Sequence, residues 1–209
     1  MKRMKNTVLS ILLIGLMVLV SGCGKEFDAK GLVESFMALM TKGETEQYCK
    51  LTGESQAEAE ADYAAMFEGA KEAFGDAPVS EEVQDAFVNA YIELLSAAKY
   101  EVHEATKDGE TYTVSMDIYP IKGAYTGVEE AVDELLADID LDTSEQDLFD
   151  AVFTAMTKVM LANKDNLSYG DPQTVDLKIV KKGNYYEIED AEAMGEKVGE
   201  LLIDQSELG

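Results

Sequence analysis

The apolar residues of this chain follow two spacings, and the spacing changes where one kind of element gives way to another. Leu32, Phe36 and Met40 recur at helical intervals, and with Asp28 as a cap they predict a helix ending near Lys42. The same spacing predicts further helices along the chain: residues 46–51, 55–74, 80–98, 126–139, 143–160 and 190–202.

Two stretches have a period of two instead, which is typical of strands with one buried face. The first, residues 100–120, turns at Asp108-Gly109. A three-residue loop with Gly109 in a bulge would place Val102 opposite Met116, and this register buries one continuous apolar face.

The second alternating stretch covers residues 175–189 and follows a predicted loop over residues 163–172. A two-residue turn at Lys182-Gly183 pairs Ile179 with Tyr186 in this hairpin, which matches apolar side chains across the strands. The same turn places Leu177 opposite Ile188.

The order of elements is helices, hairpin, helices, hairpin, helix, and this order defines the expected fold class. We predict an α+β fold in which helices pack on one face of an antiparallel sheet built from the two β-hairpins. The length suits one domain over residues 28–206.

The first 23 residues have the parts of a bacterial secretory signal. Lys2, Arg3 and Lys5 precede an apolar run that ends in Val20-Ser21-Gly22-Cys23. That ending resembles the lipobox of bacterial lipoproteins, which implies that residues 1–22 are a lipoprotein signal peptide, that Cys23 is lipidated, and that residues 23–27 form a short lipid-anchored tether. A plain signal peptide or an uncleaved membrane helix would leave a similar run, although about 20 apolar residues are usual for a spanning helix.

Charge narrows the classes of partner. Loss of residues 1–22 would remove three bases and no acids, which takes the formal charge from −25 to −28 and removes the single arginine, Arg3. A basic surface is required for nucleic-acid binding, so we expect no nucleic acid as a partner. The negative field also predicts that the domain stands off its membrane and is held by the lipid alone. Cys49 would then be the one remaining thiol, and we expect it to be a small buried side chain.

Calcium is the one cofactor that the sequence suggests. Residues 129–150 are densely acidic, and three aspartates alternate within them as in calcium loops. Thr143 stands where an EF-hand loop needs Gly, and Phe149 where it needs Glu, so the aspartates are equally consistent with a solvated link between helices. The candidate ligands are Asp138, Asp140, Asp142 and Glu145.

No motif assigns a catalytic residue. His103 is the only histidine, and the sequence places no nucleophile motif or phosphate loop beside it. Some tyrosines fall on predicted apolar faces, where they would be core residues or line the open end of a cone-shaped domain as a ligand pocket. These candidates are Tyr63, Tyr91, Tyr100 and Tyr186.

Three segments carry a family resemblance. Residues 32–63, with Lys42-Gly43-Glu44, Tyr48 and Leu51-Thr52-Gly53, resemble the opening of small clostridial (Gram-positive) cell-surface lipoproteins of unknown function. The two alternating stretches resemble the hairpins of the same family. The resemblance implies a cystatin-like, or nuclear-transport-factor-like, α+β cone, and it carries no activity and no catalytic residues.

These observations predict a lipoprotein attached to the extracytoplasmic face of the cell membrane through Cys23. We expect its domain to be a noncatalytic module that binds an envelope protein or a small ligand. The alternatives are a carboxylate-dependent hydrolase and a calcium-binding surface protein. An importer receptor is disfavoured, because 187 residues after cleavage are few for a two-lobed binding protein.

Overall fold

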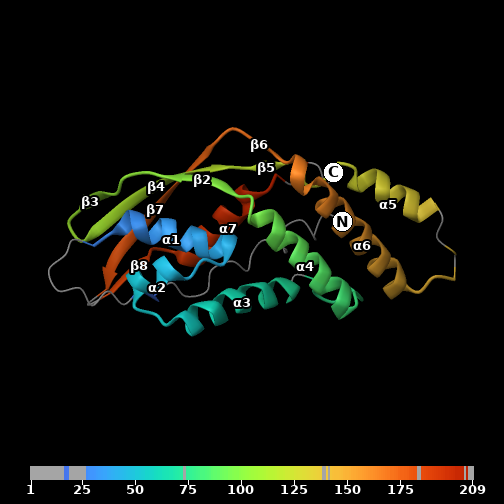
Figure 1. The fold of residues 1–209 in the computed structure, drawn as a ribbon, viewed down its shortest axis with the longest axis horizontal. Helices are drawn as coiled ribbons and strands as arrows, with labels where there is room; N and C mark the ends of the chain where they lie inside the picture. The colour runs from blue at the N-terminus through green and yellow to red at the C-terminus, as the bar shows by residue number, and fades with distance from the viewer. Residues whose placement is uncertain are drawn as a thin grey trace.

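The computed structural model describes residues 17–18, 27–72, 74–137, 140, 142–182, 185–204 and 206. Cys23 and most of the predicted signal peptide lie outside these residues. In the described part, the helices are α1 (Ala29–Lys42), α2 (Glu46–Thr52), α3 (Gln56–Glu72), α4 (Glu81–Leu95), α5 (Val128–Ala137), α6 (Glu145–Asn163) and α7 (Ala191–Leu202), with a short 3-10 helix at Lys164–Asn166 (Figure 1).

The strands form one main antiparallel sheet, as the alternating stretches predict. Its order is β1-β8-β7-β4-β2, and β3 also pairs with β4. β5 and β6 form a separate two-stranded pair. β6 lies within residues 163–172, which the sequence analysis assigned to a loop. The strands are β1 (Met17–Val18), β2 (Lys99–Val102), β3 (Thr106–Asp108), β4 (Thr111–Tyr119), β5 (Ile121–Lys122), β6 (Ser168–Tyr169), β7 (Gln173–Lys182) and β8 (Tyr185–Ile188).

One face of the sheet is apolar and is covered by helices, so the predicted α+β class is confirmed. Burial alternates along the whole of β4, with Val114, Met116 and Ile118 fully buried and the residues between them partly exposed. α1 and α7 lie over this face (Figure 1). Leu32 and Met37 from α1 and Leu202 from α7 contribute side chains that are no more than 1% exposed.

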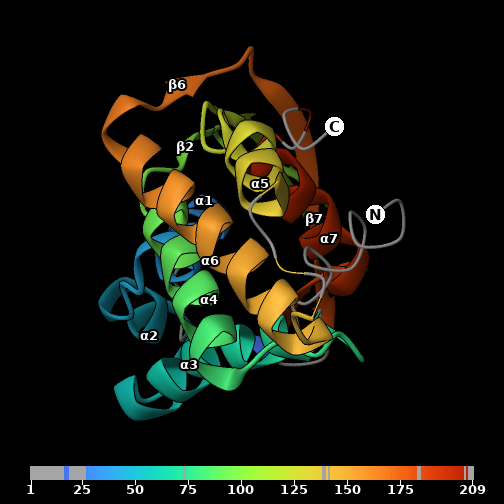
Figure 2. The same ribbon diagram turned by 90° about the vertical axis from the view of Figure 1, so that its right-hand side faces the viewer.

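A second part of the core lies among the helices beyond the sheet. α4 packs against α6, and α6 packs against α5, at the end of the molecule that faces the viewer in Figure 2. Phe74, Phe87 and Phe153 meet there edge to face, with ring centroids 5.0–5.8 Å apart. These rings join the helical end of the molecule to the core under the sheet.

The first hairpin has the predicted register but a different turn. Val102 lies opposite Met116, as expected, whereas β3 is shifted and pairs Asp108 with Thr111. Only two residues therefore form the loop, and the extra residue that the register requires is at 103–105, in a bulge between β2 and β3. The predicted bulge at Gly109 was wrong, because the apolar pattern specifies the face of a strand and leaves the position of the bulge open.

The second hairpin is displaced by two residues from the predicted pairing. Ile179 lies opposite Ile188 instead of Tyr186, and Lys182 lies opposite Tyr185. A shift of two residues keeps every side chain on its own face of the sheet, so hydrophobic alternation alone does not distinguish the two registers. The predicted turn at Lys182-Gly183 was therefore wrong, while the predicted buried face was right.

The start of α1 follows the predicted cap. The side chain of Asp28 accepts a hydrogen bond of 2.8 Å from the backbone N–H of Gly31, and Gly43 ends the helix with a left-handed φ of 69°. α1 therefore begins two residues after Phe27 and runs beneath the sheet with its apolar face inward.

Candidate functional site

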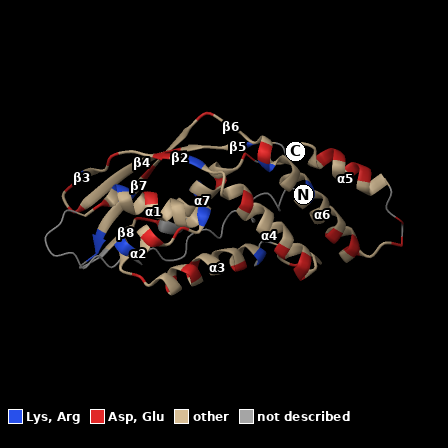
Figure 3. Cartoon of the chain, in the orientation of Figure 1, with Lys and Arg blue, Asp and Glu red and all other residues tan. Residues whose placement is uncertain are grey.

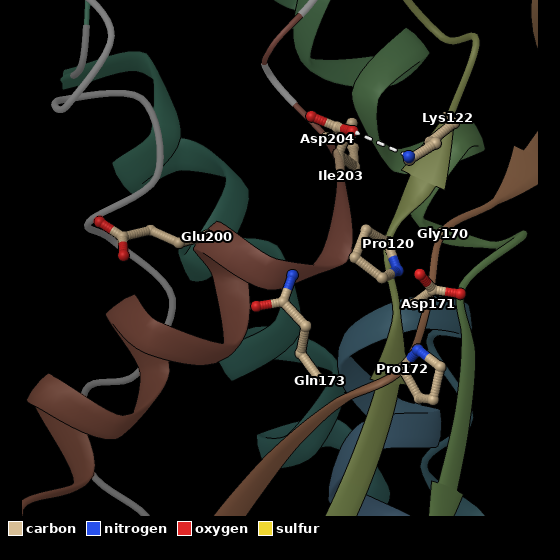
Figure 4. Close-up of a pocket in the computed structure, with 9 residues that line it drawn as sticks. All are labelled: Pro120, Lys122, Gly170, Asp171, Pro172, Gln173, Glu200, Ile203 and Asp204. Atoms are coloured by element: carbon tan, nitrogen blue, oxygen red, sulfur yellow. Dashed lines mark ion pairs between the residues drawn. The ribbon is translucent and has the colours of Figure 1, made fainter.

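A cavity lies where the end of α7 meets the β5–β6 pair and the start of β7. It has a volume of about 410 Å³. The backbone N–H of Gly170 donates to the Pro120 carbonyl, and that of Asp204 donates to the Ile121 carbonyl, both over 2.8 Å. These bonds hold three separate chain segments around the cavity. Its lining residues are Pro120, Lys122, Gly170, Asp171, Pro172, Gln173, Glu200, Ile203 and Asp204 (Figure 4).

The cavity is rich in carboxylates. Lys122 Nζ lies 3.8 Å from Asp204 Oδ2, the ion pair drawn in Figure 4, so the lysine is already partly neutralised. Hydrogen bonds from Ser206, together with the charge of Lys122, hold the pKa of Asp204 below its usual range. Asp171 and Glu200 add two further acids to the lining, and Gln173 adds an amide. This arrangement suits a small polar ligand with a cationic group better than an anion.

Sequence reasoning missed this site for a physical reason. Its residues come from segments about 50 and 80 positions apart, and no local spacing marks them. The one sequence signal is a pair of prolines, because proline interrupts strand pairing: Pro120 separates β4 from β5, and Pro172 lies just before β7.

A polar network covers the outer face of the sheet around His103. The His103 ring nitrogen Nε2 lies 3.0 Å from Asp117 Oδ2, and the Thr174 hydroxyl donates to the other carboxylate oxygen of Asp117 over 2.6 Å. Thr174, and then His103, lower the pKa of Asp117. Ser115 lies beside His103 across the strands, but its hydroxyl donates to Asp176 instead. The sequence analysis did not identify Asp117 as the partner of His103.

The four candidate tyrosines lie in three different places. Tyr63 and Tyr100 are half-buried near the end of α1, where the Tyr63 ring lies beside Gly43. Tyr91 is buried on α4. None of these tyrosines lines the cavity at the end of α7 or the hollow beside α5.

The fourth candidate, Tyr186, belongs to an aromatic cluster at the tips of the two hairpins. Its ring stacks on Phe27 at 3.9 Å and 8°, and Tyr112 meets both rings edge to face. Lys107 Nζ lies 5.0 Å from the centroid of the Tyr112 ring. Phe27, which the sequence analysis placed at the end of the tether, therefore packs on the domain.

The acidic stretch is spread over the exposed end of the molecule. Asp140 and Asp142 are exposed, and an Asp140 side-chain oxygen accepts a hydrogen bond from the Asp142 backbone. Glu145 begins α6, and Asp138 lies outside the described residues. Among the residues that are described, no group of three or more His, Cys, Asp or Glu side chains is arranged to hold a metal ion. An open hollow of about 520 Å³ beside α5 has only acidic residues and Gly127 along it.

The two cysteines differ in what the structure shows of them. Cys23 lies outside the described residues. Cys49 is half-buried on α2, and burial raises the pKa of its thiol, with the charge of Glu54 adding to the effect. In the described part of the chain, no helix combines the length and hydropathy needed to cross a membrane.

The fold and the cavity together define an α+β domain with one main antiparallel sheet and a polar hollow where the end of α7 meets the β5–β6 pair. Comparison with solved structures finds the same fold in YcdA of Bacillus subtilis, a protein classed as a lipoprotein. The two share 18% sequence identity with a TM-score of 0.61, over 85% of this chain and 56% of the YcdA chain. No protein-family model and no curated protein matches the sequence. The likeness to YcdA therefore concerns the fold, and the chain spans little more than half of that protein.

Proposed function

We propose that this protein is a lipoprotein held on the extracytoplasmic face of the cell membrane by a lipid on Cys23. The observation that carries the proposal is the Val20-Ser21-Gly22-Cys23 run, which ends only four residues before a packed domain residue, Phe27. The shared fold with a protein classed as a lipoprotein supports it. We include in the proposal that the domain is a cystatin-like cone of the small clostridial surface lipoprotein type, since its helices cover one face of a sheet.

The domain itself acts as a noncatalytic binding module in this proposal. Its binding site is the cavity between α7 and the β5–β6 edge, and the chemistry of the lining favours a small ligand with a protonated amine. Asp171, Glu200 and Asp204 would surround the cation, while Pro120 and Ile203 supply apolar walls. An envelope protein presenting a lysine side chain would offer the same group.

A hydrolase is a weaker proposal, and the neighbouring Ser115 and His103 on the outer face of the sheet do not favour it. An active hydroxyl nucleophile needs a base within hydrogen-bond reach. Ser115 donates to Asp176 over 2.6 Å, and the ring nitrogen of His103 nearest an acid is engaged with Asp117. The pair thus resembles a surface network that stabilises neighbouring strands more than a catalytic constellation.

The anchor is tested by fractionating cells that express the full chain, Cys23→Ser and Cys49→Ser. The proposal expects the parent and Cys49→Ser to sediment with membranes and to carry labelled fatty acid, and Cys23→Ser to do neither. Cys49→Ser is the matched control, because it removes the other cysteine of the chain. Membrane retention and labelling of Cys23→Ser would contradict the proposal.

The binding site is tested by thermal melting of residues 24–209 with protonated amines and zwitterionic amino acids. A ligand at about one hundred times its Kd stabilises the folded state by about 2.7 kcal/mol, which is readily measured as a rise in Tm. The rise should vanish in Asp171→Asn and persist in Asp165→Asn, an exposed acid outside the cavity lining. A rise that survives Asp171→Asn would place binding elsewhere.

A further inference from the structure

The end of the molecule nearest the predicted lipid differs in charge from the opposite end. The hairpin segments 106–111 and 178–189 contain four lysines and four acids. Residues 128–147, which include α5 and the start of α6, contain nine acids and no base. Figure 3 shows these two regions at opposite ends of the long axis, with the hairpin tips on the left and α5 on the right.

The aromatic cluster fixes where the chain enters the domain. Phe27 stacks on Tyr186 and meets Tyr112 edge to face, so residue 27 is held at the hairpin tips. Burial and the neighbouring Tyr112 raise the pKa of Tyr186, as expected of a ring packed in a cluster. Phe27 is four residues after Cys23, and at about 3.5 Å for each step the two are at most about 14 Å apart along the chain.

The basic side chains at this end lie on the strand tips around the cluster. Lys107 lies over the Tyr112 ring, and Lys181 Nζ lies 3.0 Å from Glu110 Oε1. Lys182 is the last residue of β7 and is exposed. Lys107 lies opposite Tyr112 and Lys181 lies opposite Tyr186 across the paired strands, so both lysines are next to the cluster.

We propose that the hairpin end, defined by Phe27, Lys107, Lys181, Lys182 and Tyr186, rests on the headgroups of the membrane that holds the anchor, with α5 and α6 pointing away from it. The inference rests on the proposed lipid at Cys23. It replaces the expectation that overall charge keeps the whole domain away from the membrane. Screening limits charge effects to about 8 Å at physiological salt, so the local end decides the interaction with lipid.

The orientation also gives the two ends separate roles. Lysines and aromatic rings are side chains that suit a headgroup layer, where the rings find apolar surface and the ammonium groups find phosphates. The acidic helices would then face the cell exterior. The cavity between α7 and the β5–β6 edge stays beside the sheet and open to solvent from the side.

The test uses the lipidated full chain with Cys49→Ser, reconstituted in vesicles of phosphatidylglycerol and phosphatidylcholine. A fluorophore is attached to Asp108→Cys at the hairpin tip or to Glu130→Cys on α5, and quenching by headgroup spin-labelled lipid is measured. Each substitution removes one exposed acid, so the two are matched. The lipid on Cys23 blocks that thiol from labelling.

The proposal predicts several-fold stronger quenching at position 108 than at position 130. It also predicts that Lys181→Glu with Lys182→Glu lowers quenching at position 108, and that Lys158→Glu on α6 leaves it unchanged. Equal quenching at both positions in a vesicle-bound protein would overturn the orientation and leave the anchor intact. Failure of the chain to bind vesicles would overturn both. Melting curves equal to that of the parent establish that each variant is folded.

Discussion

The Tyr91 side chain places a polar hydroxyl in the hydrophobic core. It is 7% exposed on α4, and its hydroxyl has no hydrogen-bond partner in the part of the chain that the structure describes. Burial raises the pKa of this hydroxyl, with a smaller contribution from Tyr125. A buried polar group left without a partner costs about 1–3 kcal/mol.

Tyr91→Phe should therefore leave the fold intact and raise the free energy of unfolding by about 1 kcal/mol. Tyr169→Phe is the control. The Tyr169 hydroxyl donates to the Ala97 carbonyl over 2.7 Å, so its removal should lower the free energy of unfolding. Urea denaturation measures both. A loss of stability in Tyr91→Phe would show that the hydroxyl has a partner, such as a bound water.

Burial at single positions also sets the cost of truncating a leucine. Leu94 is 1% exposed on α4, and Leu136 is 45% exposed on α5. Leu94→Ala should lower the free energy of unfolding by about 2–5 kcal/mol, because it leaves a cavity in a packed core. Leu136→Ala should change it by less than about 0.5 kcal/mol. Comparable losses in urea denaturation would contradict the assignment of these two faces.

The Asp117 carboxylate makes the stability of the folded protein depend on pH in the acid range. Its pKa is lowered by Thr174 and by His103, so its ionised form is favoured in the folded state. The resulting stability is present above the ordinary carboxyl pKa of about 3.9 and is lost as the pH falls through the lowered value. Asp117→Asn should reduce the fall in stability between neutral and acid pH, measured as Tm against pH. Thr174→Val should do so in part, and an unchanged pH profile in both variants would contradict this role.

At the scale of elements, the ends of helices follow local chemistry that the sequence displays. Ser144 caps α6, where its hydroxyl oxygen accepts a hydrogen bond of 3.1 Å from the Asp147 backbone. Ser144→Ala should lower the free energy of unfolding by about 1 kcal/mol. Ser80→Ala serves as the control, because Ser80 precedes α4 without a side-chain cap hydrogen bond. Equal effects of the two substitutions in urea would count against the cap.

Helix starts and strand faces could be predicted from the sequence because each depends on neighbours within a few positions. Asp28, Ser80, Ser144 and Asp190 all precede helices as predicted. The register of the second hairpin could not be predicted, because a two-residue shift conserves the buried face. The β5–β6 pair was missed since each of its strands has only two residues, too few for a period to be visible.

The candidate sites were harder to predict than the elements for the same reason. Lys122 and Asp204 meet across a large sequence separation, and His103 finds Asp117 only once the strands are in register. Each candidate tyrosine lies on the same face of a helix or strand as core residues, and these faces do not meet at one site. Local periodicity therefore indicates which residues are inside, and long-range pairing decides which of them meet.

At the scale of the whole molecule, β1 joins the predicted signal peptide to the main sheet of the domain. Met17 and Val18 pair with β8, although they lie in the segment that the sequence analysis expects to be removed. Removal of residues 1–22 would make β8 an edge strand at the cost of two residue pairs. Residues 24–209 should therefore unfold cooperatively in a thermal scan followed by circular dichroism, and a broad noncooperative transition would show that β1 is required.

Separation of charge along the long axis is the second property of the whole molecule. The lysines of the hairpin tips lie near the entry of the chain at Phe27, and the acids concentrate on α5 and the start of α6. A lipid at Cys23 would hold the hairpin tips toward the membrane and the acidic helices away from it. With that lipid in place, the orientation of the domain and its access to ligands in the envelope would depend on one cysteine.

The mass of the N-terminal peptide of the mature protein tests the account most directly. Protein extracted from membranes of the expressing cell is digested, and its N-terminal peptide is measured by mass spectrometry. The account predicts a peptide that begins at Cys23 and carries a diacylglyceryl group on its sulfur. A mature chain that retains residues before Cys23, or begins there with a free thiol, would contradict it.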